Sequence, residues 1–501
     1  IAEAYYSNIP LIVISADRPS YGIDIGDGQT IRQKNVYANH IGYSANLMQD
    51  VSHATNKIKQ FGRGLLKDEI SLVEHQTAIQ SFNAVAVNKA LNTASNEKCP
   101  VHINVPFEEP LYNTVNELSI SSFALPDVEV GEEQIFDITA FTNIWNASKR
   151  KMILVGVNAP STIEQQFLDV LANDPSVLVF TETTSNIHHP NFFSSIDSIL
   201  APIEKKKNSE SYFKDLQPEI LLTFGGLVVS KKIKAFLREY SPEHHWHIDS
   251  KKANNTFFCL SHHFKSEVNT FFSSFIKSTK KVESDYYKQW NEIKEQYIVK
   301  RDEYLKQINF SDMLAYSEII NQIPPKTQVH LSNSSTVRYA QLFAMDKSLQ
   351  VFCNRGTSGI DGSSSTAIGA SIHNNKPTVL ITGDLSFLYD SNALWNNYMR
   401  PDFRIIVINN SGGGIFRILP GNDDSNNFKN YFETAHSLDA SHLCEMHQLE
   451  YDSASDMETL ETVLESFYAK SNRPKLLEIK TPRIVNNKVL LGYFDYLSSE
   501  M

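Results

Sequence analysis

The sequence has few cysteines, and those it has are not paired. Four occur in 501 residues, far apart and without a CxxC spacing, at Cys99, Cys259, Cys353 and Cys444. Cysteines in such a pattern are typical of buried, reduced side chains. The pattern predicts neither a disulfide framework nor a cysteine-paired metal site, and it favours a reducing, cytoplasmic location.

Positive charge and long apolar runs are also lacking. The net charge is −11 and the isoelectric point is near 5.8, which argues against a general binder of nucleic acid or of anionic membranes. No apolar run approaches the roughly 20 residues that span a bilayer. We therefore expect neither a nucleic-acid partner nor a membrane partner, while local basic pockets for small anions stay compatible with the composition.

Histidine clusters do not have the spacing of a zinc site. "HHWH" contains His244, His245 and His247, but no cysteine pair supplies the remaining ligands. We expect these side chains at the surface or at the end of a strand.

Strand-like and helix-like segments alternate along the whole chain, which predicts an α/β fold with parallel sheets. Three stretches repeat the pattern. The expected strands are "PLIVISADRP" and "CPVHINVPFEEPLY" in the first; "KMILVGV", "VLVFTE", "EILLTFGG" and "HWHID" in the second; and "TQVHLSN", "LQVFCNR", "PTVLITGD", "FRIIVINN" and "PKLLEIKT" in the third.

The densest chemical information is in "VLITGDLSFLYDSNALWNNYMRPDFRIIVINNSGGGIF". One expected strand leads into Gly383-Asp384, and the next leads into Asn409-Asn410 and the glycines 412–414. Open parallel sheets bind ligands at the carboxyl ends of their strands. Carboxylate, amide and carbonyl oxygens suit Mg²⁺, and glycines let backbone N–H groups approach a phosphate. The segment therefore predicts a site for a divalent cation and a phosphate group.

This segment resembles the cofactor motif of enzymes that use thiamine diphosphate (ThDP), which begins with Gly-Asp-Gly and ends with Asn-Asn; here Leu385 replaces the third residue. With "NRGTSGIDG" (354–362), "NNSGGGIFRILP", "ISADRP", "GQTIRQ" and "HINVPFEEPLY", the chain resembles one branch of that superfamily. The branch is the 2-succinyl-5-enolpyruvyl-6-hydroxy-3-cyclohexene-1-carboxylate synthases (SEPHCHC synthases) of menaquinone biosynthesis.

The resemblance implies three domains and an oligomer. Residues 1–125 would be a pyrimidine-binding domain that lacks its N-terminal part, 126–305 a central Rossmann-like domain with a connector helix, and 306–501 a diphosphate-binding domain. ThDP enzymes bind their cofactor between subunits, so a homodimer or homotetramer is implied.

The resemblance also assigns roles to residues of the cofactor site. Asp384, Asn410 and the carbonyl of Gly412 would hold Mg²⁺ or Mn²⁺. The residues expected around ThDP are Ser358, Ile360, Gly383, Ser386, Gly414, Ile415 and Phe416. Ile360 would be the apolar wedge that keeps the cofactor bent.

The implied reaction is decarboxylation of 2-oxoglutarate, followed by 1,4-addition of the remaining carbon unit to isochorismate. Both substrates carry carboxylates, which arginine binds with two parallel hydrogen bonds. The residues expected to contact substrate are Arg18, Gln29, Lys232, Asn333, Ser334, Arg338, Arg355 and Leu419. Lys232 stands where the family is expected to have arginine.

Two other functions stay open. One is another ThDP-dependent 2-oxoacid decarboxylase or acetolactate-synthase-like carboligase, against which Leu385, Arg338 and Arg355 argue. The other is a non-catalytic regulatory protein with the ThDP fold.

The chain begins with "IAEAYYSNIPLIVISADRPS", which reads as a helix end followed at once by a buried strand. We expect earlier strand–helix units of the pyrimidine-binding domain upstream of Ile1. The catalytic glutamate of the family would lie there, and no glutamate in residues 1–501 matches it. A protein of these residues alone is expected to lack turnover.

Overall fold

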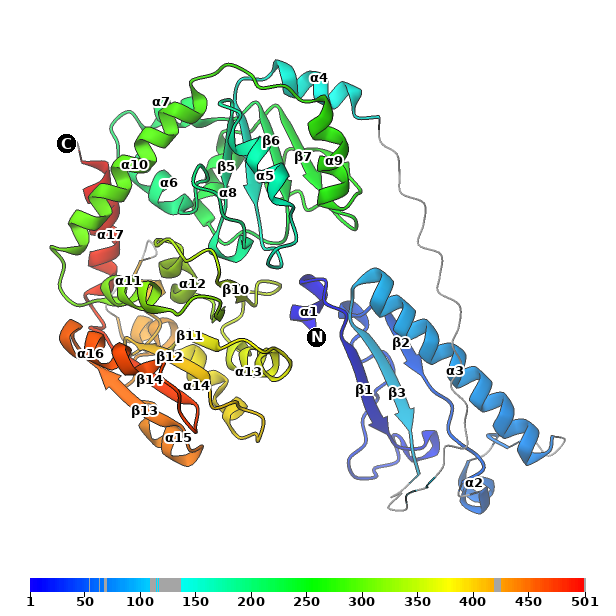
Figure 1. The fold of residues 1–501 in the computed structure, drawn as a ribbon. Helices are drawn as coiled ribbons and strands as arrows, with labels where there is room; N and C mark the ends of the chain where they lie inside the picture. Colours follow the sequence, from blue (N-terminus) through cyan, green and yellow to red (C-terminus); the bar gives the residue numbers. More distant parts are fainter. Residues whose placement is uncertain are drawn as a thin grey trace. The chain divides into compact units, whose positions relative to one another are not determined.

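The computed structural model describes residues 1–53, 55–62, 64–66, 70–108, 114, 116, 137–418 and 425–499. Packing divides the chain into two compact units, Ile1–Glu133 (unit 1) and Gln134–Met501 (unit 2) (Figure 1). Across the described ranges, no helix has both the length and the apolar character that crossing a bilayer requires.

In its described part, unit 1 is a parallel sheet with the strand order β1-β3-β2 and a long helix, α3, packed against β2 and β3. Ser71 and Glu74 form a capping box that starts α3, and Ala86, Ala90 and Ala94 of the helix enter the core. The elements are α1 (Ala2–Tyr6), β1 (Ile12–Asp17), β2 (Tyr43–Asn46), α2 (Thr55–Phe61), α3 (Leu72–Glu97) and β3 (Val101–Pro106).

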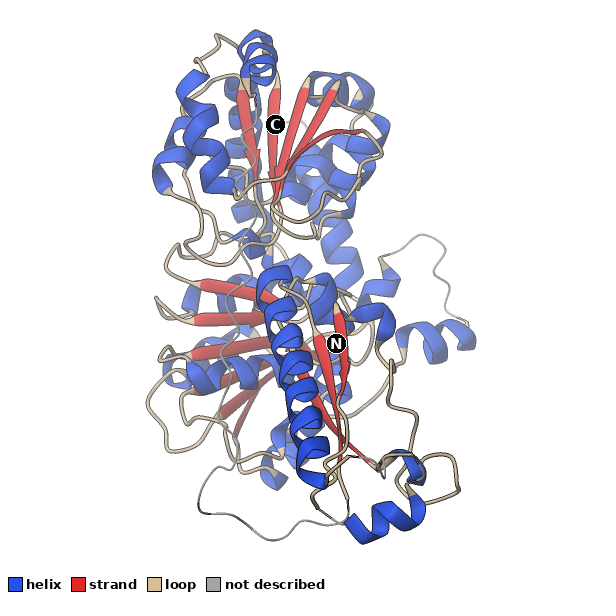
Figure 2. Ribbon diagram, turned by 90° about the vertical axis from the view of Figure 1, so that its right-hand side faces the viewer, coloured by secondary structure: helices blue, strands red, loops and turns tan. Residues whose placement is uncertain are grey.

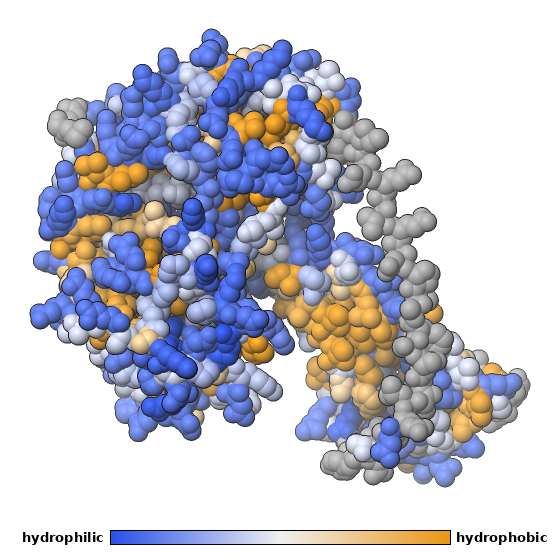
Figure 3. Space-filling model, in the orientation of Figure 1, coloured by the Kyte–Doolittle hydropathy of each residue, from blue (hydrophilic) through white to orange (hydrophobic). Residues whose placement is uncertain are grey.

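One side of β1 is exposed and apolar. Along the strand, exposed and half-buried residues alternate, and Ile12 and Ile14 are 43% and 67% exposed. Figure 3 shows an apolar area on this face of unit 1. Single exposed apolar residues are common on proteins, whereas a group of them on a sheet face is typical of a surface that another segment or subunit covers.

The first sheet of unit 2 has the order β5-β4-β6-β7-β8, all parallel. Every residue of β4, β5 and β6 is buried, as expected for strands covered on both faces. Its elements are α4 (Thr139–Ala147), β4 (Lys151–Val155), α5 (Gln165–Ala172), β5 (Val177–Phe180), α6 (Ile196–Glu204), α7 (Ser209–Leu216), β6 (Ile220–Phe224), α8 (Lys231–Glu239), β7 (His244–Ile248), β8 (Leu260–Phe264), α9 (Val268–Ser278) and α10 (Tyr286–Leu305).

The second sheet of unit 2 has the order β10-β9-β11-β12-β14-β13, again all parallel. Helices (blue in Figure 2) flank its strands (red). Its elements are α11 (Asp312–Gln322), β9 (Gln328–Leu331), α12 (Ser335–Ala340), β10 (Gln350–Cys353), α13 (Ser363–His373), β11 (Thr378–Gly383), α14 (Asp384–Tyr389), β12 (Phe403–Asn409), α15 (Ser441–Met446), β13 (Glu450–Ala454), α16 (Met457–Phe467), β14 (Lys475–Lys480) and α17 (Asn486–Ser498).

The two sheets of unit 2 share one hydrophobic core. Met152 and Leu154 of β4 belong to the same buried cluster as Val329 of β9 and Ile406 of β12. The contacts of α6 with α17, and of α10 with both, join the sheets (Figure 1). The described part of unit 2 is therefore packed as one body.

The structure confirms the predicted α/β fold with parallel sheets, and β11 and β12 are neighbours, as expected. All four cysteines are thiols in the structure. The domain boundaries after residues 125 and 305 stay predictions, since packing separates only the two units.

The expected surface or strand-end position is wrong for His245. Its side chain is 1% exposed inside β7, which lies between β6 and β8, and Nε2 lies 2.9 Å from Oγ1 of Thr223. Burial lowers the pKa of His245 to about 4, so the ring is neutral near pH 7. No group of three or more His, Cys, Asp or Glu side chains arranged to hold a metal occurs within the described ranges.

Candidate active site

Asp384 and Gly412 meet where β11 and β12 end. Gly383 lies opposite Ile408 in the parallel register, so the residues that follow both strands reach the same edge of the sheet. Asp384 starts α14 and is 5% exposed; its Oδ2 accepts the N–H of Gly412 at 2.9 Å, and its Oδ1 accepts the N–H of Leu385 at 2.6 Å. Two of the three predicted metal ligands are thus brought into contact.

The loop after β12 depends on glycine at position 412. Its φ is +144°, and a Cβ there would lie 2.7 Å from the carbonyl oxygen of Glu433. At Gly414, a Cβ would lie 3.2 Å from Nδ2 of Asn410. The corner beside Asp384 is therefore lined by bare backbone, as a phosphate-binding loop requires.

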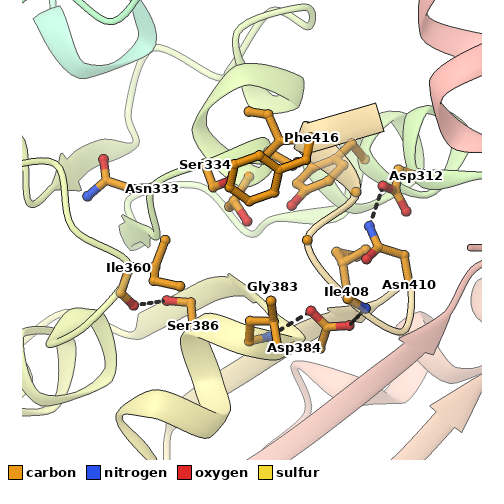
Figure 4. Close-up of a pocket in the computed structure, with 18 residues that line it drawn as sticks. Asp312, Asn333, Ser334, Ile360, Gly383, Asp384, Ser386, Ile408, Asn410 and Phe416 are labelled. Atoms are coloured by element: carbon orange, nitrogen blue, oxygen red, sulfur yellow. Dashed lines mark hydrogen bonds between the residues drawn. The ribbon is translucent and has the colours of Figure 1, made fainter. Parts of the chain in front are cut away.

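Asn410 points a buried, unused oxygen into this corner. Its Nδ2 donates to Oδ2 of Asp312 at 2.9 Å, which fixes the amide plane, while its Oδ1 has no hydrogen-bond partner in the described part of the chain. Figure 4 shows Asn410 between Asp312 and Asp384. Buried polar atoms without a partner are rare in proteins, and amide and carboxylate oxygens are ligands of Mg²⁺. The residues of the corner therefore fit a hard divalent cation.

Two neighbours shape the electrostatics of the corner. Burial raises the pKa of Asp312 to about 6, against the lowering effect of hydrogen bonds from Thr481 and Asn410. His436 Nε2 lies 3.1 Å from Oδ2 of Asp384, and this hydrogen bond raises the pKa of the imidazole.

A pocket of about 310 Å³ opens beside the corner. Ser386 Oγ donates to the carbonyl oxygen of Ile360 at 2.5 Å, which ties the loop before α13 to α14. Ile360 and Phe416 line the pocket with apolar side chains (Figure 4), and Ile415 does so too. The predicted residues that line the pocket are Asn333, Ser334, Ile360, Gly383, Asp384, Ser386, Asn410, Gly412, Gly414, Ile415 and Phe416.

Two arginines lie directly behind polar residues of the pocket. Arg355 is 9% exposed; its Nη1 donates to Oδ1 of Asn333 at 2.7 Å, and its Nε is buried without a partner among the described residues. Arg338 donates from Nη1 to the carbonyl of Ser334 at 2.8 Å. Burial and the nearby Arg355 lower the pKa of Arg338, as expected for two desolvated cations that an anion would stabilise.

Comparison with known proteins agrees with this geometry. Residues 333–479 match the family model described as thiamine pyrophosphate enzyme, C-terminal TPP binding domain. Over 500 residues, the chain is 54% identical to the 2-succinyl-5-enolpyruvyl-6-hydroxy-3-cyclohexene-1-carboxylate synthase of Christiangramia forsetii, covering 100% of this chain and 85% of the relative. The protein of that name from Flavobacterium johnsoniae is 49% identical over 99% of this chain and 84% of the relative.

The chain belongs to the SEPHCHC synthase family. It is a ThDP-dependent enzyme of the carboligase type. The matched ThDP-binding region begins at Asn333 and contains every pocket residue from there to Phe416.

Within this SEPHCHC synthase fold, Lys232 does not line the pocket. Its Nζ pairs with Oε2 of Glu204 at 2.5 Å. Lys234 lies two residues further along α8: burial lowers the pKa of its amine, and the charges of Arg355 and Arg338 add to that lowering. The charge of Lys234 therefore interacts with the charges of the two arginines.

The remaining predicted residues lie elsewhere. Ser358 precedes Ile360 in the loop before α13 but does not line the pocket. Arg18 Nη2 donates to Oε1 of Gln29 at 3.4 Å within unit 1. Leu419 lies outside the described residues. The roles of all these side chains stay predictions.

Sequence reasoning missed Asp312, Lys234 and His436. Asp312 lies in α11, Lys234 in α8 and His436 in the segment after the π-helix Phe428–Glu433. All three positions are distant in sequence from the residues on which they act. None stands in a motif, and only the Ser-Asp pair at the start of α11 gave a local signal, that of a helix start.

Proposed function

We propose that the protein binds ThDP through Mg²⁺ or Mn²⁺, decarboxylates 2-oxoglutarate and adds the remaining four-carbon unit to isochorismate by 1,4-addition, as a step of menaquinone biosynthesis. The corner formed by Asp384, Asn410 and Gly412 carries this proposal, together with relatives named SEPHCHC synthase at 54% and 49% identity. When bound, ThDP supplies the electron sink that lets a 2-oxoacid lose CO₂.

The cation would be held by Oδ atoms of Asp384, by the unused Oδ1 of Asn410 and by the carbonyl of Gly412. That carbonyl accepts the N–H of Gly414 at 2.9 Å and retains a second lone pair. Mg²⁺ keeps several positions for phosphate oxygens and water, so three protein ligands are sufficient. The backbone around Gly383, Gly414 and Ile415 would face the diphosphate.

The chain's apolar residues would position the organic part of the cofactor. Ile360 is anchored through its own carbonyl to Ser386, so its side chain has a fixed place in the pocket wall. Together with Ile415 and Phe416 it would exclude water, which strengthens every electrostatic interaction inside the pocket.

The arginines would bind the substrate carboxylates. The buried Nε of Arg355 has no acceptor among the described residues, and a carboxylate would supply one. Arg338 is desolvated and repelled by Arg355, so an anion between them would relieve both effects. Asn333 and Ser334 would present polar groups at the pocket surface.

The deciding experiment is a substrate comparison with the full-length protein, ThDP and Mg²⁺. We expect consumption of 2-oxoglutarate and release of CO₂ to depend on isochorismate, with the coupled product detected by mass spectrometry. Rapid CO₂ release from pyruvate would favour the other ThDP carboligases instead. An absence of ThDP binding in calorimetry would favour the non-catalytic alternative.

We further propose a homodimer or homotetramer in a reducing, cytoplasmic location. The exposed apolar face of β1 supports the assembly, and the small number of cysteines, none in a CxxC spacing, supports the location. Light scattering after size-exclusion chromatography would give twice or four times the mass of one full-length chain if the assembly is correct.

A further inference from the structure

A second pocket lies at the junction of α6, α10 and α17. Its volume is about 180 Å³, and it shares no lining residue with the candidate active site. These helices contact one another and join the two sheets of unit 2 (Figure 1). We call it the junction pocket; no feature of the ThDP reaction uses it.

Two cations on one face of α10 line the junction pocket. Lys294 and Arg301 are seven residues apart, about two helical turns. Lys294 Nζ donates to the carbonyl of Pro190 at 3.2 Å and lies 5.0 Å from the ring centroid of Phe193. No carboxylate in the described part of the chain lies within 4.0 Å of this amine, and burial lowers its pKa. Arg301 contacts one carboxylate, that of the largely exposed Asp302. The positive charge of the pocket is therefore only partly compensated.

A chain of hydroxyl groups forms another part of the wall. Ser195 Oγ donates to Ser198 Oγ at 2.8 Å, and Ser198 Oγ lies 2.9 Å from the phenol oxygen of Tyr493. All three residues line the junction pocket. Hydroxyl groups both donate and accept hydrogen bonds, so these three groups can turn their protons toward an anion.

The rest of the wall is mostly apolar, with the hydroxyl groups of Ser194 and Tyr297 as its polar part. Phe193, Ile199 and Leu342 line the junction pocket and are buried. Pockets for drug-sized ligands have volumes of about 300–1,000 Å³. A pocket of about 180 Å³ with cations, hydroxyls and an aromatic ring therefore suits a small molecule with one charged end and one apolar end.

We propose that the junction pocket binds a small organic carboxylate, whose charge is stabilised by Lys294 and Arg301 and whose apolar body packs against Phe193 and Ile199. The ligand would contact the central helix α6, the connector α10 and the segment after α12 at once. Ser334 and Ser335, at the start of α12, line the candidate active site, so both pockets touch this one segment.

The proposal is tested by calorimetric titration of the full-length protein with benzoate and with benzamide, its uncharged counterpart. We expect saturable binding of benzoate and none of benzamide. Lys294→Gln should weaken benzoate binding about tenfold, the size of one charge-assisted hydrogen bond. Lys288→Gln, an exposed lysine of the same helix, is the matched control and should bind as the wild type does.

Three outcomes would overturn the proposal. The first is an absence of saturable benzoate binding, and the second is binding of benzamide as tight as that of benzoate. The third is an equal benzoate affinity in the two lysine variants, because benzoate would then bind at the arginines of the active site instead. Because the benzamide comparison uses the unaltered protein, the test stands even if a variant folds poorly. The binding measurement is also independent of turnover, so a protein without the proposed activity could still bind benzoate in the junction pocket.

Discussion

At the scale of single residues, two adjacent asparagines after β12 have opposite tasks. Asn409 Nδ2 donates to Glu478 and Leu438, and its Oδ1 accepts the N–H of Ser411. Asn410 instead leaves its Oδ1 without a partner in the described chain. The first side chain serves the fold, and the second is available to a ligand.

We predict that Asn410→Ala lowers the affinity for ThDP in the presence of Mg²⁺ by about 10–100-fold, because a metal-site ligand is lost. Asn409→Ala is the matched control; it should lower the free energy of unfolding and change ThDP affinity far less. Calorimetric titration and urea unfolding give the two quantities. Equal losses of ThDP affinity in both variants would contradict a ligand role for Asn410.

Glu182 is a buried carboxyl whose protonation should affect stability. It follows β5 and accepts N–H groups of Val229 and Ser230 at 2.8–3.0 Å, just before α8. Burial raises the pKa of Glu182 to about 7 from 4.5. Between these two pH values the folded state binds more protons than the unfolded state, so stability falls as the pH rises through this window.

We predict that Glu182→Gln flattens this pH dependence. We compare the free energy of unfolding of the wild type with that of the variant at each pH. Their difference should decrease by about 3 kcal/mol from pH 5 to pH 8, since one pKa unit corresponds to about 1.4 kcal/mol. Urea unfolding at several pH values measures it. The exposed Glu239→Gln should keep the wild-type slope; a Glu182→Gln slope equal to that of Glu239→Gln would refute the assignment.

At the scale of elements, the sequence predicted the apolar strands, including the edge strands β1, β5 and β10, and missed three polar edge strands. β2, β8 and β13 were not expected, and each lies at the edge of its sheet. Their sequences, "YSAN", "LSHHF" and "EYDSA", are polar, because an edge strand is only partly covered. Apolar content detects a strand wherever it lies in the sheet, as β1 shows, whereas the pairing of a polar edge strand is decided by its neighbours.

The same limit applies to the active site. Asp384, Asn410 and Gly412 follow two adjacent strands that are close in sequence, so a local motif revealed them. Asp312 orients Asn410 from α11, and the charge of Arg355 acts on the amine of Lys234 on α8. Such contacts depend on how elements pack, and no spacing in the sequence records them.

Asn186 joins the two sheets of unit 2, because its side-chain amide forms the pair of hydrogen bonds with β10 that a neighbouring strand would form. Its Nδ2 donates to the carbonyl of Val351 and its Oδ1 accepts the N–H of Val351, both at 2.8 Å, at the edge strand β10. We predict that Asn186→Ala lowers the free energy of unfolding by about 3 kcal/mol, because two buried backbone groups lose their partner. Asn191→Ala, which removes one bond to Ala172, should cost about 1 kcal/mol. Equal losses in urea unfolding would rule out this bridging role.

At the scale of the whole molecule, the tryptophans report on one unit only. All four, Trp145, Trp246, Trp290 and Trp395, belong to unit 2, and the first three are at most 2% exposed. Their emission therefore follows the unfolding of the unit that contains the whole candidate metal corner, whereas circular dichroism follows both units.

We predict that ThDP with Mg²⁺ raises the midpoint of thermal unfolding seen by tryptophan emission. A ligand at one hundred times its Kd stabilises the folded state by about 2.7 kcal/mol, which corresponds to a shift of about 3–4 °C for a unit of this size. Removing the metal with EDTA should abolish most of the shift, because in the proposed site the oxygens of Asp384 and Asn410 would contact the cofactor only through the cation. Asp384→Asn should likewise show little shift. An undiminished shift in EDTA would mean that the diphosphate binds without the metal, and the ligand set would then have to be reassigned.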